Sequence, residues 1–330
     1  MLTRRIVVSS GTRRLPASLT LPTGAVRAVV VALNPTGDQS KDQILIGHLV
    51  QNLPSVGVAV LRFDHRPKRW GWNEPIRDQA DDALAAISEL SKGAETSNAP
   101  IGIWGWDQGC SAAVVAAATS NLVQFLILVA CSGVTPSEQM RYGTAEHLRR
   151  AGFGEEARQE LIELRSAYEG AVRGSISRAE AQRTVNRYAA RSWFPIAWVP
   201  RRIQWSPTWP DMDFDPRDFL YKVVVPTLLF YGETDEWSPI DLSIESWRLG
   251  QQVSQNGDVQ IVRPRGTGHA PTIGSGMSAR AISPDYTYAM GDWLKELPLR
   301  LSTRPMATPR PVMGGMTVPM RAIGISSAVQ

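Results

Sequence analysis

The chain has 330 residues and a net charge of only +4, with 43% hydrophobic and 20% charged residues. These values are typical of a folded globular protein and argue against a disordered chain, a fibre or a nucleic-acid-binding protein. The two cysteines are too few for a disulfide framework, no Cys/His cluster has zinc spacing, and no apolar run approaches the ~20 residues that span a bilayer.

The chain opens with two β-rich runs and then alternates apolar runs with helical patterns. Continuous apolar runs are typical of strands buried on both faces of a sheet. Strands that alternate with helices predict an α/β fold with a mainly parallel, twisted sheet and right-handed crossovers. The expected strands are 5–9, 15–21, 27–33, 58–63, 100–104, 123–130 and 223–231, with a weaker candidate at 258–262; the expected helices are 76–90, 111–119 and 283–297, the last ending before Pro298.

This alternation stops between about 132 and 215, where helical patterns precede an aromatic, Pro-rich stretch. Because strands resume at Val223, the segment is inserted between core strands, and we expect a helical cap over the carboxyl edge of the sheet. The cap helices are expected at 137–150, 154–170 and 177–191. The predicted domains are a core of 1–131 and 216–297, a cap of 132–215, and a Pro/Gly/Met-rich C-terminal tail of 298–330, which is either flexible or a contact surface for a partner or substrate.

The sequence GWDQG (105–109) joins the strand expected at 100–104 directly to a helix of small residues. Strand, Gly-flanked turn and helix form the context of a nucleophile elbow, G-x-S-x-G, in which the turn lifts its central side chain above the sheet. Here the central residue is Asp107. Asp235, in GETDEWSP, and His269, in GTGHAP, follow in the order nucleophile, acid, base.

These motifs resemble the α/β-hydrolase family over about 13–297. IWGWDQGCSAA is similar to the elbow of bacterial ester hydrolases, LRFDHR to their segment after the fourth strand, and LLFYGETDEWSP to their acid-bearing loop. Asp107 instead matches the members with a carboxylate nucleophile, the epoxide hydrolases and haloalkane dehalogenases, and Asn34-Pro35-Thr36 resembles a dehalogenase tripeptide after the third strand. The resemblance implies an α/β-hydrolase fold with an inserted helical cap, and no cofactor.

An aspartate at the elbow favours different chemistry from a serine. Carboxylate attack on an ester would give an anhydride, whereas attack on a carbon that bears a halide or an epoxide oxygen gives an ordinary ester. His269 would then activate water to hydrolyse that ester, and Asp235 would orient His269. The expected oxyanion-hole residues are Gln108, Asn34 and Thr36, acting through backbone N–H groups.

The leaving group needs a donor from the cap side of the site. An epoxide oxygen needs an acid such as a tyrosine, and a halide needs indole or amide donors. The expected substrate-pocket residues are Trp106, Trp237, Tyr142, Tyr168 and Tyr188. The cap tyrosines, and Gln108 in the place where dehalogenases carry a tryptophan, favour an epoxide over a halide.

We therefore expect a hydrolase that acts on a small apolar epoxide or, second, on a carbon–halogen bond. One alternative is an ester, lactone or thioester hydrolase, or a non-hydrolytic cyclase, with Asp107 as general base. Another is a catalytically inactive binding module that has kept the fold. The first residues lack a signal-peptide pattern, so a cytoplasmic location is expected. The expected partner is a small-molecule substrate, with no nucleic acid, membrane or metal, and a homodimer stays open.

Overall fold

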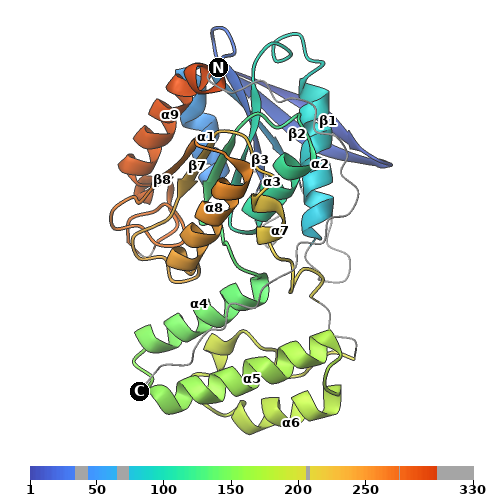
Figure 1. Cartoon of the computed structure of the whole chain (residues 1–330), viewed down its shortest axis with the longest axis vertical. Helices are drawn as coiled ribbons and strands as arrows, with labels where there is room; N and C mark the ends of the chain where they lie inside the picture. Colours follow the sequence, from blue (N-terminus) through green and yellow to red (C-terminus); the bar gives the residue numbers. More distant parts are fainter. Residues whose placement is uncertain (34–43, 65–73, 206–208, 275, 303–330) are drawn as a thin grey trace.

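The computed structural model describes residues 1–33, 44–64, 74–205, 209–274 and 276–302 (Figure 1). In this part of the chain, eight strands form one sheet in the order β1-β2-β4-β3-β5-β6-β7-β8. The first two pairings in this order are antiparallel and all later ones are parallel, so the mainly parallel sheet is confirmed. The strands are β1 (Leu2–Ser10), β2 (Arg13–Leu21), β3 (Ala28–Leu33), β4 (Val58–Phe63), β5 (Ile101–Trp106), β6 (Leu126–Val129), β7 (Thr227–Phe230) and β8 (Val259–Val262).

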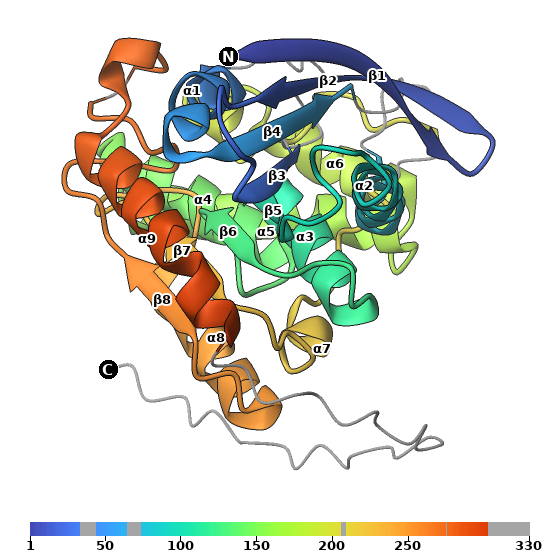
Figure 2. The same cartoon turned by 90° about the horizontal axis from the view of Figure 1, so that it is seen from above.

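Helices cover both faces of this sheet (Figure 2). In the core they are α1 (Ile44–Asn52), α2 (Ile76–Leu90), α3 (Gln108–Thr119), α7 (Arg217–Leu220), α8 (Ile240–Ser254) and α9 (Pro284–Ser302). The apolar sides of α2 and α3 share one hydrophobic core with the strands, and α1 and α9 share a second core on the opposite face. Every residue of β3 is buried, which explains its uninterrupted apolar sequence.

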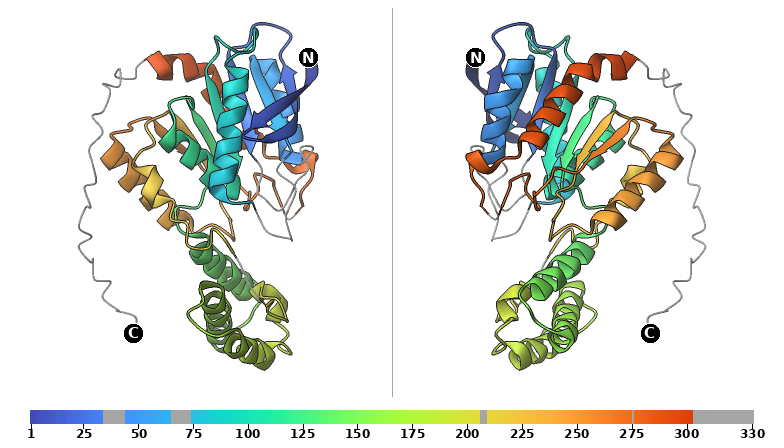
Figure 3. Two further views of the ribbon diagram at one scale, coloured as in Figure 1. Left: turned by 90° about the vertical axis from the view of Figure 1, so that its right-hand side faces the viewer. Right: turned by 90° about the vertical axis from the view of Figure 1, so that its left-hand side faces the viewer.

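The chain between β6 and β7 leaves the core and forms a helical cap (Figures 1 and 3). Its main helices are α4 (Pro136–Arg150), α5 (Glu155–Arg173) and α6 (Arg178–Tyr188). α4 starts at a capping box, in which the side chains of Thr135 and Glu138 each accept a hydrogen bond from the other residue's backbone N–H. The cap has a hydrophobic core of its own, which includes Leu148, Leu164 and Val185. The helical insertion expected between core strands is therefore confirmed.

A buried ion cluster joins the cap helices. Glu169 on α5 is fully buried and accepts hydrogen bonds from Arg141 on α4 and from Arg165 one turn earlier on α5. Arg165 is also buried and donates to the backbone oxygen of Ala197 at 2.8 Å. These charged side chains can be buried because each has a partner of opposite charge. Removing one partner would leave the other charge buried and unpaired, which destabilises the fold.

The last helix differs from the sequence prediction. α9 continues past Pro298 to Ser302, so the helix end predicted at Leu297 is wrong. Proline removes only one helical N–H, and the turn beyond it is held by an ion pair of 2.6 Å between Arg300 and Asp258. The rest of the predicted tail, 303–330, lies outside the described residues.

The sequence analysis also did not single out α8. Leu242, Leu249 and Val253 on this helix are exposed and Trp247 is buried, so large apolar residues lie on both of its sides. Among the helices of the described ranges, none is both long and apolar enough to cross a membrane.

Replacing Glu169 by leucine is expected to destabilise the protein by about 3–5 kcal/mol, because Arg165 would stay buried without its carboxylate partner. Denaturant unfolding followed by tryptophan fluorescence measures the loss. The control is Glu155→Leu, which removes a surface carboxylate paired with Arg158 and should leave the unfolding midpoint nearly unchanged. Equal midpoints for the two variants would show that the buried cluster does not stabilise the cap.

Candidate active site

Asp107 occupies a strained turn between β5 and α3. Its backbone has φ 51° and ψ −119°, a region that residues other than glycine rarely adopt. The turn is held by hydrogen bonds from the Asp107 N–H to the Val129 oxygen at 3.0 Å and from the Cys110 N–H to the Asp107 oxygen at 2.9 Å. Gly105 is required because a Cβ there would lie 2.8 Å from the Gly109 oxygen. The predicted elbow geometry is present, and the Asp107 side chain is 30% exposed.

The imidazole of His269 lies between two carboxylates. Its Nδ1 is 3.1 Å from Asp235 Oδ1 and 3.2 Å from Oδ2, and its Nε2 is 3.6 Å from Asp107 Oδ1. Asp235 is buried and also accepts hydrogen bonds from the backbone N–H groups of Trp237 and Ser238, at 2.8 and 2.9 Å. Asp235 thus orients the ring with Nδ1 as donor, and Nε2 faces the elbow.

The loop that carries His269 packs closely on the end of β7. A Cβ at Gly232 would lie 2.0 Å from the Gly268 oxygen, so only glycine fits at this approach. On the other side, Trp106 Nε1 donates to the His269 backbone oxygen at 3.2 Å. The predicted pocket residue Trp106 therefore supports the histidine loop from the strand that carries the elbow.

The charges of the three side chains shift one another's titration. Burial alone would lower the pKa of His269, but hydrogen bonds and attraction from Asp107 and Asp235 raise it to about 10. Burial would raise the pKa of Asp107, and the hydrogen bond and charge of His269 hold it below its ordinary value. The pKa of Asp235 is lowered in the same way, against burial, chiefly by His269. At neutral pH the site therefore holds an imidazolium between two carboxylates.

No protein-family model and no curated protein matches the sequence. Solved structures do match its fold. An esterase from Pyrococcus furiosus superposes with a TM-score of 0.58 at 12% identity, over 90% of this chain and 91% of the esterase. The chain has the α/β-hydrolase fold. A dienelactone hydrolase from Anabaena variabilis (TM-score 0.51, 16% identity, 90% and 97% of the two chains) and a proline iminopeptidase from Mycobacterium smegmatis (0.56, 15%, 90% and 99%) are also similar.

In this α/β-hydrolase fold, the cap contributes a hydrogen bond from Gln139 to Asp107. Gln139 lies in the first turns of α4, and its Nε2 donates to Asp107 Oδ1 at 3.0 Å. The sequence analysis missed this residue, because an amide in a helix carries no chemical signature. The available signal was positional: a helix that starts soon after β6 begins beside the elbow at the end of β5.

Two predicted pocket residues lie beside the triad. The Trp237 ring packs on His147, with centroids 4.5 Å apart, and a Cβ at Gly143 of α4 would lie 2.3 Å from that indole. Tyr142, the neighbour of Gly143, is 39% exposed, and its pKa is raised by burial and by the charges of Glu146 and Asp235. Trp237 and Tyr142 therefore remain candidates for substrate contact.

The other expected residues have different outcomes. The Tyr188 hydroxyl donates to Glu163 within the cap, and Tyr168 packs against the cap core, so the contacts of both lie in the cap and the structure does not bring them to the triad. The backbone N–H of Gln108 donates to the Asp107 carboxylate. The expected oxyanion residues Asn34 and Thr36 lie outside the described residues.

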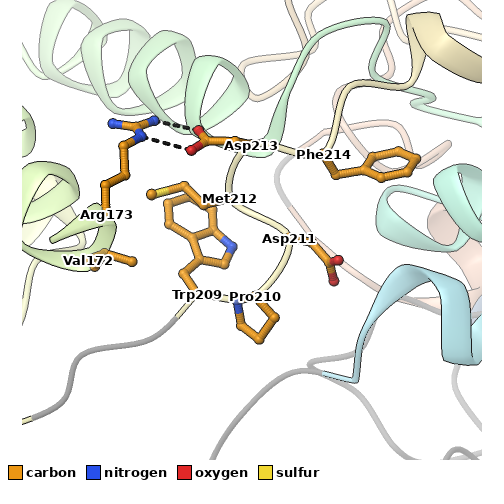
Figure 4. Close-up of a pocket in the computed structure, with 8 residues that line it drawn as sticks. All are labelled: Val172, Arg173, Trp209, Pro210, Asp211, Met212, Asp213 and Phe214. Carbon is orange, nitrogen blue, oxygen red and sulfur yellow. Dashed lines mark hydrogen bonds and ion pairs between the residues drawn. The ribbon is translucent and has the colours of Figure 1, made fainter. Parts of the chain in front are cut away.

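A cavity of about 530 Å³ lies where the cap chain returns to the core (Figure 4). Arg173 and Asp213 form an ion pair at its wall, and Asp211 accepts the Ile76 N–H at 2.9 Å at the start of α2. Its polar groups therefore serve the junction of cap and core, and the triad does not line it. Within the described ranges, no cluster of three His, Cys, Asp or Glu side chains could hold a metal.

The ring of His269 is expected to stay protonated until the pH approaches about 10. Its NMR chemical shifts should titrate there in the native protein. Asp107→Asn removes one of the two carboxylates and should move the midpoint to lower pH, whereas the surface change Glu155→Gln should not. A wild-type midpoint near the ordinary histidine value of about 6.5 would show that the carboxylates do not hold the proton.

Proposed function

We propose that this protein is a hydrolase in which the Asp107 carboxylate attacks a saturated carbon of a small apolar epoxide. The observation that carries the proposal is the position of the His269 ring between Asp107 and Asp235, beneath a strained elbow. A carboxylate with a lowered pKa is a weak base, but it is fully ionised and needs no base to activate it. Nucleophilic attack therefore suits Asp107 better than general-base catalysis.

The protonated His269 supplies the acid that ring opening requires. As an oxygen of Asp107 bonds to carbon, the carbon–oxygen bond of the epoxide breaks, and the leaving oxygen takes the proton from Nε2 of His269. The products of this step are a hydroxyalkyl ester on Asp107 and a neutral imidazole. We assign to His269 the acid role that the sequence analysis gave to cap tyrosines. The contacts of Tyr168 and Tyr188 lie within the cap, and Tyr142 stays a candidate for substrate contact.

The second step reuses the same imidazole. Esterification removes the negative charge of Asp107, so the pKa of His269 falls and its neutral ring accepts a proton from water. The hydroxide bonds to Cγ of Asp107, and the tetrahedral intermediate then expels the alkoxide. The alkoxide takes the proton of the carboxylic acid that forms on Asp107. A diol leaves, and both Asp107 and His269 regain their starting charges.

This proton balance favours an epoxide over a halide. A halide leaves without a proton, so His269 would stay protonated after the first step and would have to lose its proton to solvent before it could activate water. Ring opening of an epoxide deprotonates His269 in the step that precedes its use as a base.

His269→Gln should slow ring opening, which loses its acid, and should also block hydrolysis, which loses its base, so that the ester that forms on long incubation persists. After incubation with an epoxide panel, mass spectrometry should find the peptide that contains Asp107 heavier by one substrate. In wild type, a single turnover in ¹⁸O-water should place the label in the Asp107 carboxylate. Asp107→Asn, the matched control, should show neither signal. Ester turnover without label in Asp107 would contradict the covalent mechanism and favour the general-base alternative.

The first step should depend on pH through the proton of His269. The rate of ester formation should be level at neutral pH and fall as the pH rises through about 10, where His269 loses its proton. At low pH it should fall only below the ordinary aspartate range, because the pKa of Asp107 is lowered. Rapid mixing with a brief pH jump measures this rate. A haloalkane should show no alkaline fall, and an epoxide rate that is level through pH 10 would refute the acid role of His269.

A further inference from the structure

The cap places a neutral hydrogen-bond donor on the nucleophile. Gln139 Nε2 donates to Asp107 Oδ1 at 3.0 Å, a shorter distance than the 3.6 Å between that oxygen and His269 Nε2. An amide cannot protonate a leaving alkoxide and carries no charge. Its chemical contribution is limited to stabilising negative charge on the oxygen that it contacts.

The two oxygens of Asp107 are therefore not equivalent. Oδ1 accepts the amide hydrogen bond and faces the imidazolium, which makes it the less nucleophilic oxygen. Attack by Oδ2 leaves Oδ1 as the carbonyl oxygen of the ester. When hydroxide then bonds to Cγ, the electron pair of the carbonyl moves onto Oδ1, and full negative charge develops where Gln139 donates.

We propose that the Gln139 side chain is an oxyanion donor for hydrolysis of the Asp107 ester, so that the cap completes the oxyanion hole. This inference rests on the proposed function. Gln139 contacts the reacting group and is therefore a catalytic residue of the second step. In the first step its hydrogen bond is weakened as charge leaves the carboxylate, so its contributions to the two steps have opposite sign.

The start of α4 holds this donor in place. Ser137, two residues before Gln139, donates its N–H to the Met212 oxygen at 3.0 Å, and its hydroxyl donates to Asp213 at 3.3 Å. Arg173 of α5 pairs with the same Asp213. The first turn of α4 is thus fixed to the returning chain at the junction of cap and core, and the amide needs little reorganisation to meet the developing charge.

The test separates the two chemical steps in Gln139→Met, which keeps the length of the side chain and removes its N–H. Rapid quenching and mass spectrometry give the rates at which the epoxide ester forms and disappears. Hydrolysis should slow by about 10²–10³-fold, the usual cost of one oxyanion donor, while ester formation keeps its rate or accelerates. The ester should consequently accumulate in steady state.

Gln182→Met is the matched control. Gln182 is another cap glutamine, on α6, and its amide donates to the side chain of Asn186 and to the backbone oxygen of Arg201. The same chemical change there should leave both rates unchanged. Circular dichroism and the unfolding midpoint check that each variant keeps its cap folded.

The outcomes distinguish the two proposals. If Gln139→Met slows both steps equally, or slows only ester formation, then Gln139 positions the site or serves the leaving group, and the oxyanion role is wrong while the covalent mechanism stands. Unchanged rates for both steps would also overturn the oxyanion role. If Gln139→Met never accumulates an ester and the wild-type enzyme places no ¹⁸O label in Asp107, the covalent mechanism fails, and this inference fails with it.

Discussion

The site depends on one electrostatic arrangement, an imidazole held between two carboxylates. Asp235 alone would orient His269, as an acidic residue does in a serine hydrolase. The second carboxylate, Asp107, lies 3.6 Å from Nε2, and together Asp107 and Asp235 keep the proton on the ring and raise the pKa of His269 to about 10. Two features of the fold hold Asp107 and His269 close together. The elbow lifts Asp107 above the sheet, and Gly232 lets the histidine loop approach the end of β7.

The cap adds to this arrangement without changing its charge. Two carboxylates and one imidazolium leave the site with one net negative charge. A cationic cap residue bonded to Asp107 would compete with His269 for the Asp107 carboxylate. Gln139 instead supplies a hydrogen bond from a neutral amide. The arginines Arg141 and Arg165 donate their hydrogen bonds to Glu169 within the cap rather than to Asp107. The cap thereby stabilises charge on Oδ1 while leaving the proton on the ring.

The sequence was sufficient to predict the site residues that follow the ends of strands. Asp107 directly follows β5, and Asp235 and His269 lie in the loops after β7 and β8. Because the carboxyl ends of parallel strands meet at one edge, their proximity could be predicted. Which residues of the cap helices face the site could not be predicted from the sequence. Tyr188 and Gln139 both lie in predicted helices, but which one faces the elbow depends on how the cap packs, which periodicity does not encode. The end of α9 was missed because the contacts beyond Pro298 are tertiary: Leu301 packs against the core, and Arg300 pairs with Asp258.

An aspartate at the elbow changes the direction in which the proton first moves. With a serine, the imidazole faces one carboxylate, is neutral, and begins catalysis as a base that activates the hydroxyl. In the mechanism proposed for Asp107, the nucleophile is already ionised, and its charge makes the same imidazole an acid at the start. Bond formation then removes that charge, and the ring becomes a base when a base is needed. On this proposal, the same fold would serve acyl transfer when the side chain at the turn is neutral and ring opening when it is charged. The charge of the side chain at the turn sets the protonation state of the neighbouring imidazole.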